Sequence, residues 1–259
     1  MMELGQVCVV VGAAGDVGRG VTAQLLRAGA KVLAIGRDAE KLDQLRDEMQ
    51  SMGSLEILTG SLADHDTAAE LHRRVRERHP QVDAVIVSVN GSTPTAPLAT
   101  QAVNGFAEMF RTNVLSHLIG LQTFVSAIRR GGMYIAIGGG MADWIFPGAG
   151  MTSACQAAQR AMVRSFAAEN EEKAGIRIRE LMLHSMIAGR SKRDVAQPNW
   201  ITDNDVGRHV LTMLTHPEAF PDVVVNLKSR KQVGQIPISA PETSTPVGPV
   251  SDNKERATS

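Results

Sequence analysis

Short runs of apolar residues alternate along the chain with longer segments in which apolar residues recur every three or four positions. The short runs are rich in Val and Ile, which is typical of strands buried on both faces of a parallel sheet. The segments between them have helical spacing and would supply the crossovers that parallel strands need. We therefore expect an α/β fold, a single Rossmann-type doubly wound parallel sheet with helices on both faces. The seven expected strands are residues 8–11, 32–35, 55–58, 82–89, 133–137, 176–183 and 223–227.

Apolar residues at helical spacing indicate the faces that the helices turn toward the sheet. Val21, Leu25 and Leu26 form one such stripe, and a longer stripe runs from Phe106 to Leu121. Another segment carries small residues, against which a strand or a helix of a second subunit could pack closely. The residues of this small-residue face are Ala154, Ala157, Ala158, Ala161 and Met162. A further apolar stripe consists of Leu42, Leu45 and Met49.

The length and composition predict one domain followed by a tail. A chain of 259 residues with 43% hydrophobic content can form a single domain with a substantial core. From about residue 229 the sequence is rich in Pro, Ser and Thr and ends in a polar run, which cannot bury enough apolar surface to offset the entropy of ordering. We expect the domain over residues 1–228 and a flexible tail over residues 229–259.

The charge balance and the cysteines exclude several classes of function. Lys plus Arg and Asp plus Glu both number 27, so no net positive field attracts nucleic acid or anionic lipid. No apolar run reaches the roughly 20 residues of a membrane helix, and the first residues do not resemble a signal peptide. We expect a cytoplasmic protein without nucleic-acid or membrane partners. Cys8 and Cys155 lack metal-ligand spacing and are expected to be buried thiols, with no metal site.

A glycine-rich turn joins the first expected strand to the first helix. Glycine lets the backbone turn tightly and approach a pyrophosphate, while the start of the helix offers free amide groups and a partial positive charge. Because the turn lies within an alternating pattern of strands and helices, it predicts a dinucleotide site rather than a bare structural turn. The residues expected to bind are Gly12, Ala14, Gly15, Asp16, Val17 and Gly18.

Two charged residues near this turn bear on the choice of cofactor. Arg37 follows the second strand, where no acidic side chain lies directly at the strand end, so the 2′-phosphate of NADP(H) is favoured over the ribose of NAD(H). The alternative is that Arg37 is a solvated residue at the start of the next helix. Asp16 would repel a pyrophosphate, and we interpret it as the N-cap of the first helix, with Arg19 offsetting part of its charge.

In order and spacing, these segments resemble the short-chain dehydrogenase/reductase family over about residues 6–227. Residues 88–91 are similar to the family's Asn-Asn-Ala-Gly segment, and residues 111–114 are similar to the helix that carries its catalytic asparagine, here Asn113. The resemblance implies a substrate loop over residues 184–203 and dimers or tetramers built through helices. It also implies a nicotinamide cofactor, with further contacts from Ser61, Leu62, Asn90 and Gly91.

The residues that would transfer a proton depart from the family's pattern. Where the resemblance places a tyrosine and, four residues later, a lysine, this chain has Thr152 and Gln156, and Gly138 or Gly139 replaces the serine. The tyrosine works because a neighbouring ammonium lowers the pKa of its phenol from about 10, whereas neither Thr nor Gln ionises near neutral pH. Thr152 and Gln156 share one helical face and are expected to line the pocket, with Gln156 a candidate partner for ribose hydroxyls.

Other residues near the expected pocket could substitute for the missing groups. His184 follows the sixth strand, where the family has a Pro-Gly turn, and is the candidate acid or base; a strand-capping role is the alternative. Asp143 is a weaker candidate or a turn former, and His117 is expected to pack under the site or at a subunit contact. The residues that would contact an apolar ligand, or else pack in the core, are Gly139, Met141, Trp144, Phe146 and Trp200.

Three functions fit these residues. The first is an NADP(H)-dependent oxidoreductase that transfers hydride to or from a small apolar carbonyl or alcohol without the usual proton donor, because orientation alone lowers a barrier substantially. The second is an inactive cofactor-binding sensor or hetero-oligomer subunit, and the third is a lyase or isomerase on the same scaffold. The family resemblance favours the first function, and the missing Ser, Tyr and Lys favour the second.

Overall fold

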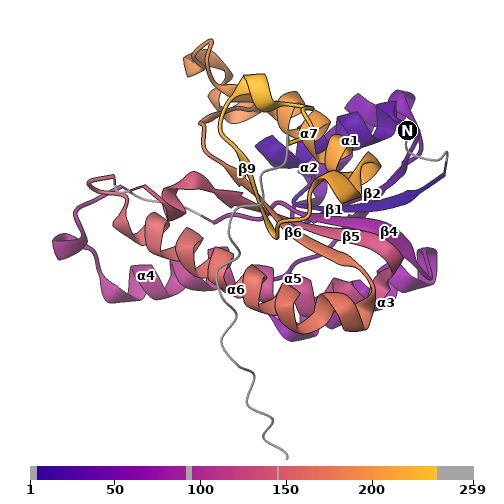
Figure 1. The fold of residues 1–259 in the computed structure, drawn as a ribbon, viewed down its shortest axis with the longest axis horizontal. Helices are drawn as coiled ribbons and strands as arrows, with labels where there is room; N and C mark the ends of the chain where they lie inside the picture. Colours follow the sequence, from indigo (N-terminus) through magenta and orange to yellow (C-terminus); the bar gives the residue numbers. More distant parts are fainter. Residues whose placement is uncertain (1–4, 92–94, 145, 238–259) are drawn as a thin grey trace, which may run out of the picture.

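A seven-stranded parallel sheet forms the centre of the computed structural model, which describes residues 5–91, 95–144 and 146–237 (Figure 1). The strand order is β3-β2-β1-β4-β5-β6-β9, and all six neighbouring pairs are parallel. The predicted fold is therefore confirmed. The strands are β1 (Val7–Val11), β2 (Lys31–Gly36), β3 (Leu55–Thr59), β4 (Val82–Val87), β5 (Ile128–Gly139), β6 (Arg177–Leu183) and β9 (Val224–Leu227).

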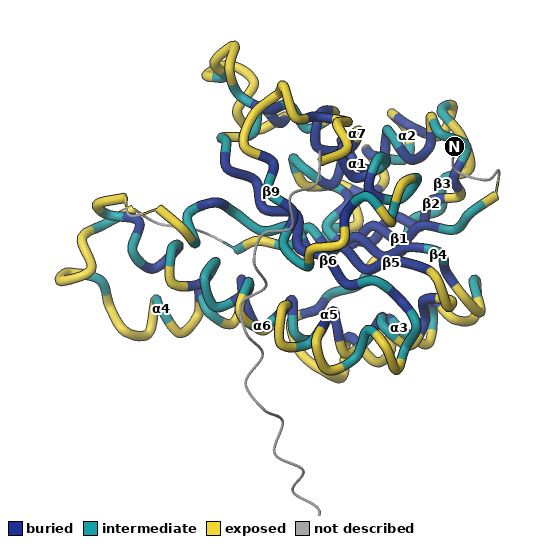
Figure 2. The backbone as a smooth tube through the Cα atoms, viewed as in Figure 1, coloured by how far each residue is buried: buried dark blue, intermediate teal, exposed yellow. Residues whose placement is uncertain are grey.

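Helices cover both faces of the sheet (Figure 1). One apolar cluster joins the sheet to α1, α2 and α7, and a second cluster joins the opposite face to α3, α5 and α6. The strand residues of both clusters are almost entirely buried, which explains their continuous apolar runs (Figure 2). No described helix is long and apolar enough to cross a membrane. The helices are α1 (Asp16–Arg27), α2 (Ala39–Met49), α3 (His65–Arg78), α4 (Val103–Phe110), α5 (Ser116–Phe124), α6 (Gly150–Ala174) and α7 (Asp203–Thr215).

The glycine-rich turn lies between β1 and α1, beside the end of β4. Gly12 has a φ of 81°, which favours glycine, and a Cβ atom on it would lie 2.1 Å from the carbonyl oxygen of Ser88. Because the strand order reverses between β1 and β4, a crevice opens at this point outside the carboxyl ends of the strands. The turn thus lies where sheets of this kind bind ligands.

The long apolar stripe from Phe106 to Leu121 is not one helix. It is divided into α4, a π-helical turn (Arg111–Leu115) and α5. Single π-helical turns are frequent at functional sites, and this one carries Asn113. A spacing pattern does not distinguish the i to i+5 turn from an α-helix, because apolar residues on both sides of the turn remain buried: Met109 and Val114 pack against α6, and Leu121 packs against the sheet.

The structure adds detail at α6 and in the substrate loop. Of the expected small-residue face of α6, Ala158 and Met162 pack against the apolar group of Met109, Val114, Met151 and Cys155, while Ala154 and Ala161 are exposed. Packing of a second subunit on this face stays a prediction. The substrate loop contains two short paired strands, β7 (Ile187–Ala188) and β8 (Ile201–Thr202), and a 3-10 segment (Arg190–Val195).

Residues 230–234 of the expected tail pack against the domain. Arg230–Gln232 form a 3-10 turn, Val233 is buried in the core, and the amide of Gly234 donates to Nδ1 of His209 on α7 at 3.3 Å. Val233, the Gly234 amide and an ion pair between Arg230 and Asp205 attach this segment to the domain, whereas the Pro, Ser and Thr content of the residues that follow predicted a tail from residue 229. Residues 238–259 of the expected tail lie outside the described residues.

Candidate functional site

A cavity of about 720 Å³ opens at the carboxyl ends of the strands. It extends from the start of α1, past the ends of β4 and β5, to α6 and the substrate loop. Its walls bring together segments that are far apart in the sequence. Of the predicted site residues, the cavity is lined by Gly15, Asp16, Val17, Asn90, Asn113, Gly139, Met141, Trp144, Phe146, Thr152, Gln156 and His184.

Several predicted residues do not line this cavity. Leu62 is part of the core, and the hydroxyl of Ser61 accepts a hydrogen bond from the amide of Ala63. Trp200 lies at the end of the substrate loop, next to β8, and its side chain does not reach the cavity. The other predicted residues that are absent from the lining are Gly12, Ala14, Gly18, Arg37 and Gly91.

The interpretation of Asp16 as a helix cap is wrong. The N-cap of α1 is Gly15, and Asp16 is the first helical residue. Its carboxylate accepts hydrogen bonds from the amide of Ser191, at 2.9 Å, and from the Ser191 hydroxyl. Arg19, expected to offset this charge, forms an ion pair with Glu48 of α2 instead. A side chain caps a helix from the extended residue before it, and that position belongs to glycine here.

Arg37 is exposed directly after β2, and the next residue begins the capping of α2. The Asp38 carboxylate accepts the amide of Lys41 at 3.1 Å, and this hydrogen bond lowers the pKa of Asp38 below its ordinary value. The acidic side chain nearest to the end of β2 is therefore engaged with α2, which leaves the Arg37 guanidinium as the group that faces solvent there.

Asn113 holds the loop after β4 in place. Its side-chain oxygen accepts the amide of Gly91 at 2.8 Å, and its nitrogen donates to the carbonyl of Met109 at 2.9 Å. His117, one turn further along, lies with Nε2 3.0 Å from the carbonyl oxygen of Val89. Burial lowers the pKa of His117 to about 4, so it is neutral at physiological pH. Both side chains support the cavity wall, and His117 packs under the site as expected.

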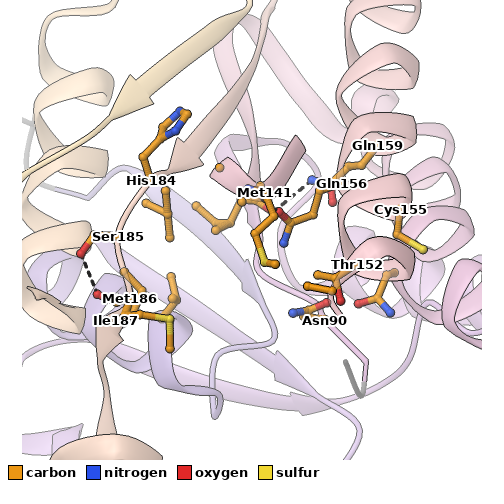
Figure 3. Close-up of a pocket in the computed structure, with 18 of the residues that line it drawn as sticks. Asn90, Met141, Thr152, Cys155, Gln156, Gln159, His184, Ser185, Met186 and Ile187 are labelled. Carbon is orange, nitrogen blue, oxygen red and sulfur yellow. Dashed lines mark hydrogen bonds between the residues drawn. The ribbon is translucent and has the colours of Figure 1, made fainter. Parts of the chain in front are cut away.

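Thr152 and Gln156 lie on the face of α6 that borders the cavity, as predicted (Figure 3). The side-chain oxygen of Gln156 accepts the backbone amide of Met141 at 3.0 Å. Gln156 therefore holds the turn that follows β5, and its oxygen is already engaged. Thr152 is 6% exposed and carries a hydroxyl that is neutral at any accessible pH. Neither side chain supplies an ionisable group to the cavity.

Three successive glycines form the cavity floor at the end of β5, and each contacts a different side chain. A Cβ atom on Gly138 would lie 2.5 Å from Oε1 of Glu180, and one on Gly139 would lie 2.3 Å from Nε2 of Gln156. On Gly140 it would lie 2.6 Å from Nδ1 of His184. The volume that a serine side chain would need is therefore filled at each candidate position.

His184 and Asp143 both have partners. His184 lies on the opposite side of the cavity from Thr152 and Gln156 (Figure 3), and its Nε2 is 2.7 Å from the side-chain oxygen of Asn226 on β9. Its ring packs edge-on against Trp144, with centroids 5.4 Å apart. Asp143 forms an ion pair with Arg160 of α6. The structure brings His184 to the cavity wall and gives Asp143 a structural role.

Sequence reasoning missed two residues beside the floor. Gln159 lines the cavity and donates its side-chain amide to the carbonyl of Ile137 at 3.0 Å. Glu180 lies behind Gly138, is 0% exposed, and neither of its oxygens has a hydrogen-bond partner in the described part of the chain. Burial raises the pKa of Glu180 to about 8, and the nearby Arg160 opposes this effect only in part. Both residues could have been found from the sequence. Gln159 lies seven residues after Thr152 and therefore on the same helical face, and Glu180 is a charged residue within an apolar strand.

The described residues fit a dinucleotide at most points. Gly12 lets the turn approach the end of β4 closely, the free amides of the first turn of α1 border the cavity, and the cavity continues to the face of α6. Asp16 is the exception, because its carboxylate lies at the helix end where a phosphate would bind.

The sequence is similar to known dehydrogenases and reductases. A sequence model of the short chain dehydrogenase family matches residues 6–193. The chain is 25% identical over 126 residues to the rhamnolipids biosynthesis 3-oxoacyl-[acyl-carrier-protein] reductase of Pseudomonas aeruginosa, covering 49% of each chain. It is 30% identical over 132 residues to the fluoren-9-ol dehydrogenase of Terrabacter, covering 48% of this chain and 37% of the other. The matches thus span half or less of these relatives' lengths.

Solved structures share the fold over nearly the whole chain. An alcohol dehydrogenase from the archaeon Thermococcus sibiricus, complexed with 5-hydroxy-NADP, has a TM-score of 0.75 and 22% identity, covering 90% of this chain and 98% of the other. The RhlG/NADP active-site complex of Pseudomonas aeruginosa has a TM-score of 0.77 and 19% identity, covering 86% and 95%. With the family match over residues 6–193, the sheet order and the glycine-rich turn, the chain belongs to the short-chain dehydrogenase family of oxidoreductases.

Proposed function

We propose that this protein is an NADP(H)-dependent oxidoreductase that transfers hydride to or from a small apolar carbonyl or alcohol, with an atypical active site. The observation that carries the proposal is the continuous cavity of about 720 Å³ that joins the start of α1 to the Thr152 face of α6. A cofactor and a small second ligand need one shared space, because hydride transfer requires direct approach of the reacting atoms. When bound, the nicotinamide supplies or accepts the hydride.

The preference for NADP(H) rests on the end of β2. Arg37 is exposed there, and a guanidinium can bind a 2′-phosphate with two parallel hydrogen bonds. Asp38, the acidic residue that could instead bind ribose hydroxyls, caps α2 through the amide of Lys41. The solved relatives complexed with NADP and 5-hydroxy-NADP are consistent with this preference.

The walls of the cavity favour a small, neutral, apolar ligand. Met141, Trp144, Phe146 and Met186 line it, and the last three side chains are about half exposed in the described structure. Apolar side chains that are exposed together at a cavity mouth indicate a ligand that covers them. Asp16 and Lys192 are the only Asp, Glu, Lys or Arg residues in the described lining, so their charges cancel.

The chain's own residues would orient the ligand rather than transfer its proton. The Thr152 hydroxyl can donate a hydrogen bond to a carbonyl oxygen, while Asn113 and Gln156 hold the loop after β4 and the turn after β5. The proton that a carbonyl reduction consumes would come from water, from the substrate itself or from His184. Orientation without an acid gives a slow enzyme, not an inert one.

A second candidate, an inactive cofactor-binding sensor or hetero-oligomer subunit, is favoured by the floor of the cavity. Gly139 is closed to a serine by Gln156, and the Gln156 oxygen is bound to Met141. A lyase or isomerase that used His184 and Asp143 has less support, because Asn226 and Arg160 engage them. Assembly into dimers or tetramers is part of both leading candidates, with the exposed Ala154 and Ala161 on α6 as a contact face.

The test combines binding with turnover. NADPH and NADH are titrated by fluorescence, and oxidation of the tighter-binding cofactor is then followed with a panel of small apolar ketones, aldehydes and quinones. Binding with turnover supports the oxidoreductase, and binding without turnover supports the sensor or subunit. If neither cofactor binds at millimolar concentration, both the oxidoreductase and the cofactor-binding sensor or subunit are rejected.

A matched pair of variants tests the role of Thr152. Thr152→Ser keeps the hydroxyl and Thr152→Val keeps the shape of the side chain. We expect Thr152→Val to raise KM for the carbonyl compound while Thr152→Ser does not. Equal KM values in the two variants would show that the hydroxyl does not position the substrate.

A further inference from the structure

The substrate loop is fastened to the glycine-rich turn by the carboxylate of Asp16. Two donors of Ser191, its backbone amide at 2.9 Å and its hydroxyl, point to the two oxygens of this carboxylate. Residues 16 and 191 are 175 positions apart, so the contact belongs to the tertiary fold and not to a local turn. The loop thereby lies across the start of α1.

Close packing confirms that the loop is seated against Asp16. Gly189 is buried, and a Cβ atom on it would lie 2.4 Å from the Cβ of Asp16 and 2.5 Å from its Cγ. No larger residue could occupy position 189 while the loop keeps this position. A second carboxylate, Glu48 of α2, accepts hydrogen bonds from Arg190 and from Arg19 of α1. The segment 189–191 is therefore held at two points.

Asp16 also borders the cavity at the point where the fold offers a positive end. The first amides of α1 have no partner within the helix, and the helix dipole favours a negative group there. In this chain, a negative group is already built into the first helical residue. A pyrophosphate brought to the same place would meet the Asp16 carboxylate, while Lys192 is the single Lys or Arg of the described lining.

We propose that Asp16 is an internal anion that takes the place of a phosphate at the start of α1 and holds the substrate loop closed. Dinucleotide binding then requires the Asp16 to Ser191 contact to break, so Asp16 limits the affinity for NADP(H). The inference depends on the proposed function only for the identity of the ligand, and the position of the loop can be measured without any ligand.

The variant Asp16→Asn removes the charge and keeps the shape of the side chain, and Asp16→Gly removes both. Asp64→Asn is the matched control, because Asp64 is an acidic residue at the start of α3 that does not line the cavity. NADPH is titrated by fluorescence into each protein. Hydrogen–deuterium exchange of residues 187–195 is measured in the absence of NADPH, after circular dichroism has shown that each variant is folded.

We expect both Asp16 variants to bind NADPH at least tenfold more tightly than the wild type, and residues 187–195 to exchange faster. Asp64→Asn should change neither. Unchanged or weaker NADPH binding in the Asp16 variants would overturn the inference, as would undetectable binding in every protein.

The outcomes separate this inference from the proposed function. If the wild type fails to bind NADPH and Asp16→Asn binds it, the inference holds and the native use of NADP(H) fails. If the wild type and Asp16→Asn bind equally well, the proposed function holds and Asp16 does not limit the affinity.

Discussion

Glu180 makes the stability of the protein depend on pH in a way that one substitution should abolish. The side chain is 0% exposed behind the cavity floor, and burial raises its pKa from 4.5 to about 8. In the unfolded chain, the carboxyl is ionised above pH 4.5, whereas in the folded chain it stays protonated until about pH 8. Folding therefore takes up a proton between these values, and raising the pH through this interval favours unfolding.

The size of this change in unfolding free energy follows from the uptake of one proton on folding. Each pH unit within the interval costs ~1.4 kcal/mol of unfolding free energy. Between pH 6.5 and about 8, the wild type should lose about 2 kcal/mol from this group. The full contribution is present below pH 4.5 and is lost as the pH rises through about 8.

The variant Glu180→Gln keeps the size of the side chain and cannot ionise. Between pH 6.5 and 9, the unfolding free energy of Glu180→Gln, measured with urea, should not show the decrease that ionisation of Glu180 causes in the wild type. The difference in unfolding free energy between the variant and the wild type should therefore change in favour of the variant as the pH rises to about 8. Glu172→Gln, on the exposed surface of α6, is the control and should follow the wild type. Parallel stability curves for Glu180→Gln and the wild type would refute the assignment of a buried, protonated carboxyl.

Three further results are expected. Gly139→Ser should destabilise the fold by about 1–3 kcal/mol, because its Cβ would lie 2.3 Å from Nε2 of Gln156. In a double-mutant cycle measured by urea unfolding, Gln156→Ala should remove most of this cost, and additive effects of the two substitutions would contradict the contact. Asn113→Ala should cost about 1–3 kcal/mol because it leaves the Gly91 amide without its side-chain acceptor, and it should speed hydrogen exchange at Gly91. An unchanged exchange rate would show that the loop needs no such support. Burial lowers the pKa values of His117 and His209 to about 4, so folded stability should fall as the pH drops from 6.5 toward 4; His209→Gln should reduce this loss, and an identical acid profile would contradict the burial of an uncharged ring.

The sequence predicted the elements whose signals are local. The short apolar runs predicted the seven strands because most of their residues are buried in the sheet, most fully in the central strands β1, β2 and β4. The glycines after Val11 predicted the turn because Gly12 needs a positive φ. Thr152 and Gln156 were placed on one face because both lie on a regular helix. These are all consequences of periodicity or of a single residue's backbone.

Contacts between distant segments could not be predicted in this way. Asp16 was assigned to helix capping, although its partner Ser191 lies 175 residues away in a loop with no regular pattern. Gly138 gave no sign that its missing side chain makes room for Glu180 on the neighbouring strand. In both cases, a contact between distant segments decided the role of the residue, and only the three-dimensional structure shows which side chain lies beside it.

Neighbouring side chains fill the space beside each of the three glycines in the cavity floor. A site that only lost side chains would leave voids, and voids are costly in a packed interior. Here Glu180, Gln156 and His184, from β6, α6 and the end of β6, each fill the space beside one glycine of the row 138–140. Burying Glu180 with no hydrogen-bond partner in the described part of the chain is itself unfavourable, because a buried polar group normally needs one. A serine at 139 requires Gln156 to move, and moving Gln156 releases the Met141 amide that shapes the turn. A serine at position 139 therefore has to be accompanied by changes at Gln156 and in the turn after β5.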